Sequence, residues 1–306
     1  MADWGGLPAD TEVQVFRDHL AETDALARRL EGFDVVALMR ERTPIGLELF
    51  QRLPVLRLLV TTGMRNASID LDAATDHGVL VCGTGGLGYP TAELTWGLIL
   101  ALVRHVAEEN AAMRQGRWQL TVGTGLQGKV LGVLGLGRLG SQVATIGAAF
   151  GMSTIAWSQN LTAERAIQFG ATLVKRDELF ALSDILSIHL QLSDRTRGLV
   201  GSREIGMMKP TAYLINTSRG PIVDTTALVE ALGREAIAGA GLDVFDQEPL
   251  PPTHPLLQLD NTVLTPHLGY VTLEGYRVFY EETVEDIAAY LRGEPLRMLN
   301  PPSGSA

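Results

Sequence analysis

Three side chains with complementary chemistry stand at or just after the ends of short apolar runs in the sequence. They are Arg219, Glu248 and His267. A guanidinium binds a carboxylate through paired hydrogen bonds, and an imidazole exchanges protons near neutral pH, which a neighbouring carboxylate favours. Taken singly, Arg219 could be a surface arginine, Glu248 a loop carboxylate and His267 a histidine at a strand end. Their joint occurrence at the ends of expected strands favours a catalytic group.

A glycine-rich segment follows an apolar run at 130–134 and opens a helical pattern. Its sequence is Gly135-Leu136-Gly137-Arg138-Leu139-Gly140. Glycines at this spacing permit a tight turn and let a pyrophosphate approach backbone amides at a helix N-terminus, where the helix dipole favours anions. An ordinary glycine-rich turn between a strand and a helix is the alternative. The flanking strand and helix patterns predict a dinucleotide-binding site.

The end of the next expected strand bears on the choice of nucleotide. Ser158, Gln159 and Asn160 stand where an Asp or Glu would bind the adenosine ribose. Without a carboxylate there, a 2′-phosphate is not repelled, and the nearest downstream arginine is Arg165. Small polar side chains can equally hydrogen-bond the ribose of NAD. We therefore expect NAD or NADP as the cofactor, with NADP preferred.

Apolar runs alternate with helical patterns along nearly the whole chain, which indicates a parallel α/β architecture. The expected strands are 13–16, 34–39, 56–61 and 79–82 in the first series, and 130–134, 154–157, 185–189, 212–216, 238–244 and 262–265 in the second. The helical patterns cover 21–30, 47–52, 91–116 and 272–292. The sequence thus predicts two α/β domains bridged by one long helix, with a disordered tail at 300–306.

Composition excludes several classes of protein. The 306 residues include 25 basic and 35 acidic side chains, a net charge of −10, which argues against a nucleic-acid-binding protein. The single cysteine, Cys82, excludes an intrachain disulfide, and the six histidines show no metal-ligand spacing, so we expect no metal. The start of the chain lacks a signal-peptide pattern, and the longest apolar run, 94–103, is too short to span a membrane. A cytoplasmic protein with no membrane partner is expected.

The motifs together resemble the D-isomer-specific 2-hydroxyacid dehydrogenase family over nearly the whole chain. The resemblance rests on the glycine segment, AELT at 92–95, INTSRG, GLDVFDQEP and TPHLG. It implies an NAD(P)-dependent oxidoreductase that transfers hydride between nicotinamide and a small 2-keto or 2-hydroxy acid. The implied fold is a Rossmann-type doubly wound sheet at 93–271, inserted into a smaller flavodoxin-like substrate domain at 1–92 and 272–306. A cleft between the domains and a homodimer through the helix at 91–116 are also expected.

The resemblance also implies roles for single residues. Arg219 would bind the substrate carboxylate and carbonyl, and His267 would donate the proton in reduction and accept it in oxidation. Glu248 would pair with His267, and Asp243 would hold the nicotinamide carboxamide. The loop Thr62-Gly63-Met64-Arg65 would offer backbone amides to the substrate. The other implied cofactor contacts are Thr84, Gly135, Gly137, Arg138, Leu139, Gly140, Ser158, Gln159, His189, Leu190, Thr217, Ser218, Leu268 and Gly269.

The chain also departs from the family pattern. Tyr270 stands where many relatives carry a small residue, and Met64-Arg65-Asn66 replaces the more usual small and acidic residues. The family's first strand has no counterpart in residues 1–12, so we expect a shortened small domain.

The keto acid stays open among glyoxylate, hydroxypyruvate, pyruvate, phenylpyruvate and 3-phosphohydroxypyruvate, with formate or phosphite oxidation more remote. The alternative function is a dinucleotide-sensing, corepressor-like binding module on the same fold, and a third is an assembly protein with a vestigial nucleotide site.

Overall fold

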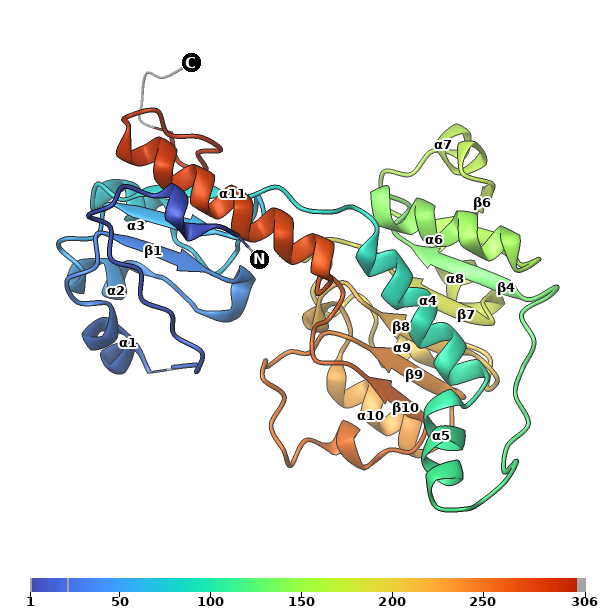
Figure 1. Cartoon of the computed structure of the whole chain (residues 1–306). Coiled ribbons are helices and arrows are strands. Elements are labelled where there is room, and N and C mark those ends of the chain that lie inside the picture. Colours follow the sequence, from blue (N-terminus) through green and yellow to red (C-terminus); the bar gives the residue numbers. More distant parts are fainter. Residues whose placement is uncertain (1, 21, 302–306) are drawn as a thin grey trace. The chain divides into compact units, whose positions relative to one another are not determined.

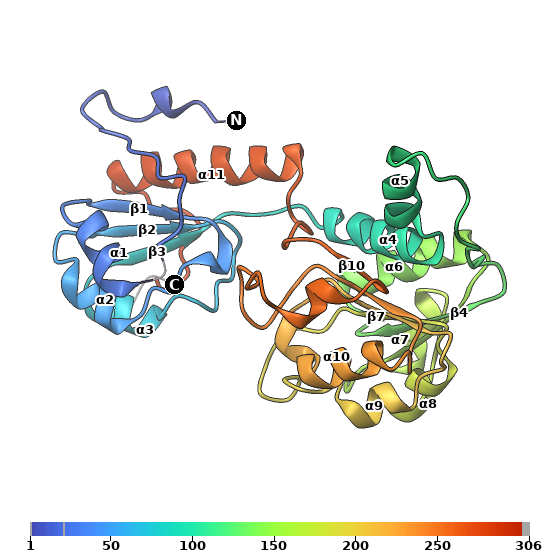
Figure 2. The ribbon, with the colours of Figure 1, turned by 90° about the horizontal axis from the view of Figure 1, so that it is seen from below.

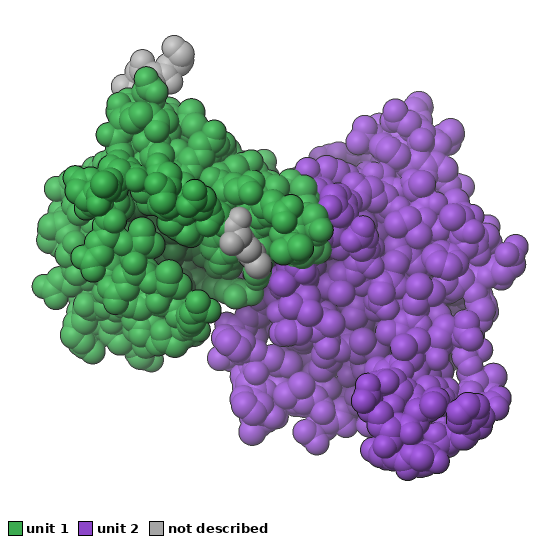
Figure 3. All heavy atoms as spheres, viewed as in Figure 1, with its two compact units in different colours: residues 1–87, 272–306 green, residues 88–271 purple. Residues whose placement is uncertain are grey.

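The computed structural model describes residues 2–20 and 22–301, which form two compact units (Figures 1 and 3). Unit 1 comprises residues 1–87 and 272–306, and unit 2 comprises residues 88–271. The chain therefore crosses between the units twice, after Leu87 and after Val271. In the described part of the chain, no helix is long and apolar enough to cross a membrane.

Unit 1 is a small parallel sheet with helices on both faces. Its strands are β1 (Val35–Leu38), β2 (Leu58–Thr61) and β3 (Leu80–Gly83), in the order β1-β2-β3. Its helices are α1 (Thr23–Leu30), α2 (Leu47–Arg52), α3 (Leu71–Asp76) and α11 (Leu273–Leu291), with the short 3-10 turns η1 (Trp4–Gly6) and η2 (Arg40–Arg42). Figure 2 shows α1, α2 and α3 on one face of the sheet and α11 on the other.

Alternation along the central strand explains these two layers. Leu59 packs into the apolar cluster beneath α1, α2 and α3, whereas Leu58 and Val60 pack against Val284 and Ile287 of α11. Successive side chains of a strand point to opposite faces, so a continuous apolar run is the pattern of a strand covered on both sides. Every residue of β2 is buried.

The strand expected at 13–16 is wrong. These residues are in no strand, and Val13 and Val15 are 44% and 66% exposed. β1 ends the sheet and pairs with β2, so the described residues offer 13–16 no neighbouring strand. Apolar and β-branched residues favour an extended backbone, but a strand is stable only when its backbone N–H and C=O groups pair with those of a neighbouring strand.

Unit 2 is a doubly wound sheet of seven parallel strands in the order β10-β9-β8-β7-β4-β5-β6. The strands are β4 (Val130–Leu134), β5 (Ser153–Trp157), β6 (Ala171–Leu173), β7 (Ile185–Ile188), β8 (Tyr213–Asn216), β9 (Gly239–Leu242) and β10 (Thr262–Leu264). The helices are α4 (Pro90–Val103), α5 (Val106–Arg114), α6 (Arg138–Ala149), α7 (Ala163–Gln168), α8 (Arg176–Leu182), α9 (Ser202–Gly206) and α10 (Thr225–Gly233), with η3 (Gly220–Ile222) and η4 (Pro255–Gln258). The predicted α/β class and two parallel sheets are confirmed. The three-residue strand β6 was not predicted, because so short a run carries little pattern.

The order of strands reverses between β4 and β7, which defines the switch point of the sheet. One face carries α4 and α6 over an apolar cluster that includes Trp96 and Val143. The other face carries α8, α9 and α10 over a second cluster that includes Phe180 and Leu228. All strands are parallel, so their carboxyl ends meet at one edge, where such sheets bind their ligands.

The prediction of one continuous helix at 91–116 is wrong. The segment forms two helices, α4 and α5, which are separated at His105, a residue with a left-handed φ of 52°. The carbonyl of Val103 accepts a hydrogen bond from the distant Thr124 at 2.7 Å, which helps to end α4 there. The final helix was predicted at 272–292, and its N-cap is Thr272, whose side chain accepts a hydrogen bond from Gly275.

The tail expected to be disordered at 300–306 is partly ordered. The side chain of Asn300 accepts a hydrogen bond from Val81 at 2.7 Å and donates one to Val79 at 3.0 Å, beside the strand β3. The neighbouring Met298 forms an antiparallel bridge with Cys82. Residues 302–306 lie outside the described part of the chain, as does Ala21, where the first helix was expected to begin.

Candidate active site

The glycine segment forms the turn between β4 and α6, at the centre of the unit 2 sheet. Gly135 has a φ of 103°, and a Cβ there would lie 2.9 Å from the carbonyl of His189. A Cβ on Gly140 would lie 2.1 Å from the carbonyl oxygen of Gly135. Both positions therefore require glycine. A Cβ on Gly137, the N-cap of α6, would meet nothing within 4 Å. That space at the helix N-terminus fits a nucleotide pyrophosphate.

The end of β5 carries the polar segment that follows Trp157. Ser158 is half-buried, and Gln159 and Asn160 are exposed. Arg165 stacks over the ring of Phe169, with its guanidinium carbon 5.1 Å from the ring centroid. The end of β5 therefore carries neutral polar side chains.

The ends of β7 and β8 are tied together beside the glycine turn. The hydroxyl of Ser218 donates a hydrogen bond to the carbonyl of Leu190, and the hydroxyls of Thr217 and Thr95 lie 2.8 Å apart. His189 places Nε2 2.8 Å from the hydroxyl of Ser187. Burial lowers the pKa of His189 to about 4, so this imidazole is neutral at physiological pH. Its proximity to Gly135 fits a polar contact with a dinucleotide.

Arg219 follows β8 in extended backbone, between that strand and η3. Its Nη1 donates a hydrogen bond to the carbonyl of Ser218 at 2.8 Å, and its own carbonyl accepts one from Asn216 at 3.0 Å. The next residue, Gly220, is so close to Phe245 that a Cβ would lie 2.1 Å from the Phe245 carbonyl carbon. The backbone that carries the guanidinium is therefore fixed on both sides.

A short hydrogen bond joins the side chains of His267 and Glu248. Nδ1 of His267 lies 2.6 Å from Oε2 of Glu248, and Oε1 of Glu248 accepts a hydrogen bond from Phe245 at 2.9 Å. Burial raises the pKa of Glu248, but the hydrogen bond and charge of His267 outweigh burial and lower that pKa below its ordinary value. An ionised carboxylate on Nδ1 stabilises the imidazolium and leaves Nε2 as the atom that exchanges a proton with a ligand.

Asp243 anchors the segment that carries His267. Its Oδ1 accepts hydrogen bonds from the hydroxyl of Thr265 at 2.6 Å and the amide of Leu268 at 2.7 Å, and its Oδ2 accepts one from Gly269 at 2.8 Å. The residue is fully buried, and burial raises the pKa of its carboxyl against these hydrogen bonds. Sequence reasoning missed this anchoring role, since no sequence pattern shows which amides a buried carboxylate accepts. Its contact with a nicotinamide amide stays a prediction.

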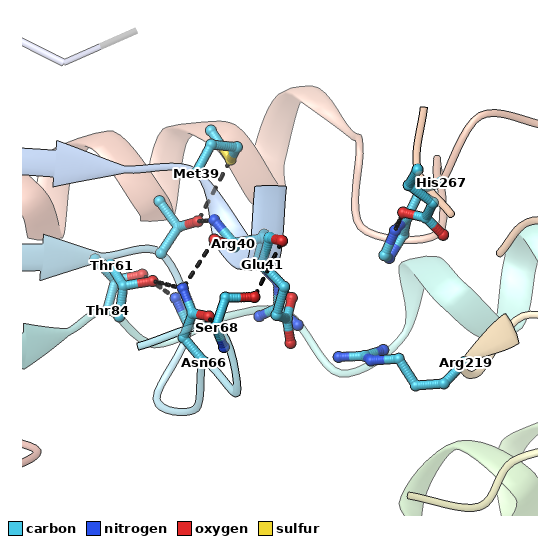
Figure 4. A network of polar contacts seen from close by, with 12 residues as sticks. Met39, Arg40, Glu41, Thr61, Asn66, Ser68, Thr84, Arg219 and His267 are labelled. Carbon is cyan, nitrogen blue, oxygen red and sulfur yellow. Dashed lines mark hydrogen bonds and ion pairs between the residues drawn. The ribbon is translucent and has the colours of Figure 1, made fainter. Parts of the chain in front are cut away.

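A polar network in unit 1 surrounds the loop expected to bind substrate. The amide of Gly63 donates to the hydroxyl of Thr84 at 2.9 Å. Asn66 donates to the carbonyl of Arg40 at 2.8 Å and to the hydroxyl of Thr61 at 2.9 Å (Figure 4). Of the loop residues, Met64 and Arg65 are exposed.

Arg40 belongs to this network, and sequence reasoning did not single it out. Its backbone amide donates to the hydroxyl of Thr62 at 3.0 Å, and its φ of 51° is left-handed. Its guanidinium lies over Gly63, where a Cβ would lie 2.1 Å from Nη1. One sequence signal could have identified Arg40. It directly follows the expected strand at 34–39, and polar residues at the ends of parallel strands often contribute to a site.

The glycine turn, Arg219, Glu248 and His267 all lie at the carboxyl edge of the unit 2 sheet. The NAD-binding domain of the D-isomer specific 2-hydroxyacid dehydrogenases matches residues 96–269. A glyoxylate reductase from Aeropyrum pernix is 41% identical over 286 residues, covering 90% of this chain and 85% of the relative. The chain belongs to the D-isomer-specific 2-hydroxyacid dehydrogenase family. The resemblance inferred from the sequence motifs is thereby confirmed.

Further relatives extend the comparison. A D-3-phosphoglycerate dehydrogenase from Archaeoglobus fulgidus is 35% identical over 277 residues, covering 90% of this chain and 52% of the relative. The crystal structure of a phosphoglycerate oxidoreductase from Vibrio cholerae O395 superposes with a TM-score of 0.91 at 34% identity, covering 95% of each chain. The family member described here is an NAD(P)-binding oxidoreductase acting on CH–OH groups.

Replacing Glu248 by Gln tests the ion pair through its pH dependence. The lowered pKa keeps Glu248 ionised from neutral pH down to below the ordinary value of 4.5, so the negative charge beside His267 is lost only in acid. The amide oxygen of glutamine can still accept from Nδ1, so the variant replaces a charge-assisted hydrogen bond with a neutral acceptor that is about half as strong. The pH above which keto-acid reduction declines should therefore be lower in the variant than in the wild type, because a neutral partner favours the charged imidazole less than a carboxylate does.

The measurement is kcat for reduction between pH 5 and 9. Glu164→Gln, at an exposed carboxylate of the same unit, is the matched control and should leave the profile unchanged. A Glu248→Gln profile identical to that of the wild type would remove Glu248 from the proton transfer.

Proposed function

We propose that the chain reduces small 2-keto acids to D-2-hydroxy acids with NAD(P)H, and catalyses the reverse oxidation. The observation that carries this proposal is the 2.6 Å pair of His267 and Glu248, at the same sheet edge as Arg219 and the nucleotide-binding glycine turn. An anchored cation, an acid with an ionised partner and a dinucleotide turn are the groups that reduction of a carbonyl beside a carboxylate requires.

In this mechanism Arg219 binds the carboxylate of the substrate through its planar guanidinium. The nicotinamide supplies a hydride to the carbonyl carbon when bound. Nε2 of His267 gives its proton to the carbonyl oxygen, so that reduction adds one hydride and one proton. Glu248 stabilises the imidazolium before the transfer, and the same groups take the proton back in oxidation.

We assign the nucleotide to Gly135, Gly137 and Gly140 with the amides of Arg138 and Leu139, which the geometry of the turn supports. The remaining expected contacts are proposed on the family pattern: Thr84, Ser158, Gln159, His189, Leu190, Thr217, Ser218, Asp243, Leu268 and Gly269. NADP is the proposed preference, because the end of β5 carries no carboxylate to repel a 2′-phosphate.

Unit 1 is proposed as the substrate domain, with its loop 63–65 binding the substrate carboxylate. The amide of Gly63 already donates a hydrogen bond to Thr84, so the amides of Met64 and Arg65 are the ones proposed to bind the substrate carboxylate. Among the candidate acids, glyoxylate is the first choice, since the relative with 41% identity is a glyoxylate reductase. Hydroxypyruvate and 3-phosphohydroxypyruvate follow.

We also propose a homodimer through α5 and the segment that follows it. Met113, Trp118 and Val122 are 55%, 75% and 94% exposed there. Large apolar side chains that a monomer leaves exposed to water gain stability when a second copy covers them. Sedimentation velocity of the wild type and of Trp118→Glu should give a dimer and a monomer, respectively, and a monomeric wild type would contradict the proposal.

The decisive test is absorbance at 340 nm, the band of reduced nicotinamide, with NADPH and NADH offered separately against a panel of 2-keto acids. We expect oxidation of the cofactor by glyoxylate, faster with NADPH than with NADH. Nucleotide binding without turnover of any keto acid would instead favour the sensing module. Preference for NADH would overturn the reading of Ser158, Gln159 and Asn160.

A further inference from the structure

Tyr270 lies against the ring of the proposed acid. The centroids of the His267 and Tyr270 rings are 5.5 Å apart, and their planes meet at 74°, an edge-to-face contact. Edge-to-face packing is one of the favourable arrangements of two aromatic rings.

The backbone that carries Tyr270 is held on both sides. Asp243 accepts hydrogen bonds from Leu268 and Gly269, and the hydroxyl of Thr91 donates to the carbonyl of Gly269 at 2.9 Å. The amide of Val271 closes a turn onto the carbonyl of Leu268 at 2.8 Å. The backbone segment that carries the Tyr270 ring is therefore fixed by hydrogen bonds on both sides of this residue.

The orientation of the His267 side chain depends on few contacts. Its φ of 56° lies in the left-handed region, and among the described residues its imidazole makes one hydrogen bond, at Nδ1 with Glu248. The covalent bond to Cβ and the hydrogen bond at Nδ1 already restrain the ring. The contact with Tyr270 restrains it further and narrows the range of directions in which Nε2 can point.

We propose that Tyr270 is a positioning residue for His267, and that the same ring limits the substrate to 2-keto acids with a small group on the carbonyl carbon. The inference rests on the proposed function, in which Nε2 must point at the carbonyl oxygen. A substrate hydrogen-bonded to Nε2 brings its carbonyl substituent next to the ring that packs on the imidazole. Glyoxylate, with hydrogen as this substituent, avoids the ring, whereas the benzyl group of phenylpyruvate meets it.

The test compares Tyr270→Phe with Tyr270→Leu. The phenyl ring keeps the edge-to-face contact, so Tyr270→Phe should retain kcat with glyoxylate to within about twofold. Tyr270→Leu should lower kcat about 3–10-fold, the loss equivalent to about 0.5–1.5 kcal/mol, with the Kd for NADPH unchanged. It should also raise kcat/KM for phenylpyruvate relative to glyoxylate at least tenfold. Tyr290→Leu, on α11 in unit 1, is the matched control and should change neither ratio.

A spectroscopic measurement separates this inference from the proposed function. The proton between Nδ1 of His267 and Glu248 should give a downfield proton NMR signal in the wild type and in Tyr270→Phe. In Tyr270→Leu the signal should broaden or exchange faster with water, even if no keto acid is reduced. Absence of turnover in the wild type would sink the proposed function alone. An unchanged NMR signal in Tyr270→Leu, or wild-type kcat and substrate ratio in that variant, would overturn the role of Tyr270.

Discussion

Replacing His267 by Asn should lower kcat for keto-acid reduction by about 10²–10⁴-fold while the Kd for NADPH changes by less than about threefold. A positioned acid contributes about this much to a proton transfer, and asparagine has no group that can donate a proton to a developing alkoxide. Asparagine also tolerates the left-handed backbone of this residue, whose φ is 56°. The loss should therefore report chemistry rather than unfolding.

The measurements are steady-state kinetics at saturating cofactor and fluorescence titration of the nucleotide. His19→Asn, at an exposed histidine of unit 1, provides the control and should behave as the wild type. A melting transition of the His267→Asn variant close to that of the wild type would show that the fold is intact. Turnover above about a tenth of the wild-type rate would exclude His267 as the general acid.

Replacing Arg219 by Lys should lower kcat/KM for every 2-keto acid by about 10–150-fold, the equivalent of one charged hydrogen bond of about 1.5–3 kcal/mol. Lysine keeps the charge but presents a point cation in place of a planar fork, so a carboxylate loses its paired hydrogen bonds. The bond from Nη1 to the carbonyl of Ser218, which orients the guanidinium at 2.8 Å, is lost as well.

The effect should appear mainly in KM for the keto acid, with nucleotide affinity preserved. Arg203→Lys makes the same change at an exposed ion pair with Asp177 in unit 2, and its kinetics should match those of the wild type. Equal kcat/KM values for Arg219→Lys and the wild type would show that the substrate carboxylate is bound elsewhere.

Several features follow from the sequence alone. The glycine turn between β4 and α6 was predicted because its signals lie in one short stretch of sequence. A strand precedes it, a helix follows it, and Gly135 and Gly140 stand where a Cβ would collide with the backbone. The strands that end before Arg219 and His267 were predicted because buried parallel strands are continuous apolar runs. Family membership follows from these motifs in their order, which the comparisons confirm.

Other features depend on contacts between segments far apart in the chain. Residues 13–16 have the composition of a strand, yet the described residues give them no partner, and His105 interrupts a helical pattern that is continuous in the sequence. The anchoring of Leu268 and Gly269 by Asp243 likewise joins residues that are 25 and 26 positions apart and whose meeting no spacing specifies. A short-range pattern determines which backbone conformation a segment favours. Pairing and burial by distant segments decide which conformation is kept, because they satisfy its backbone groups and fix its side chains.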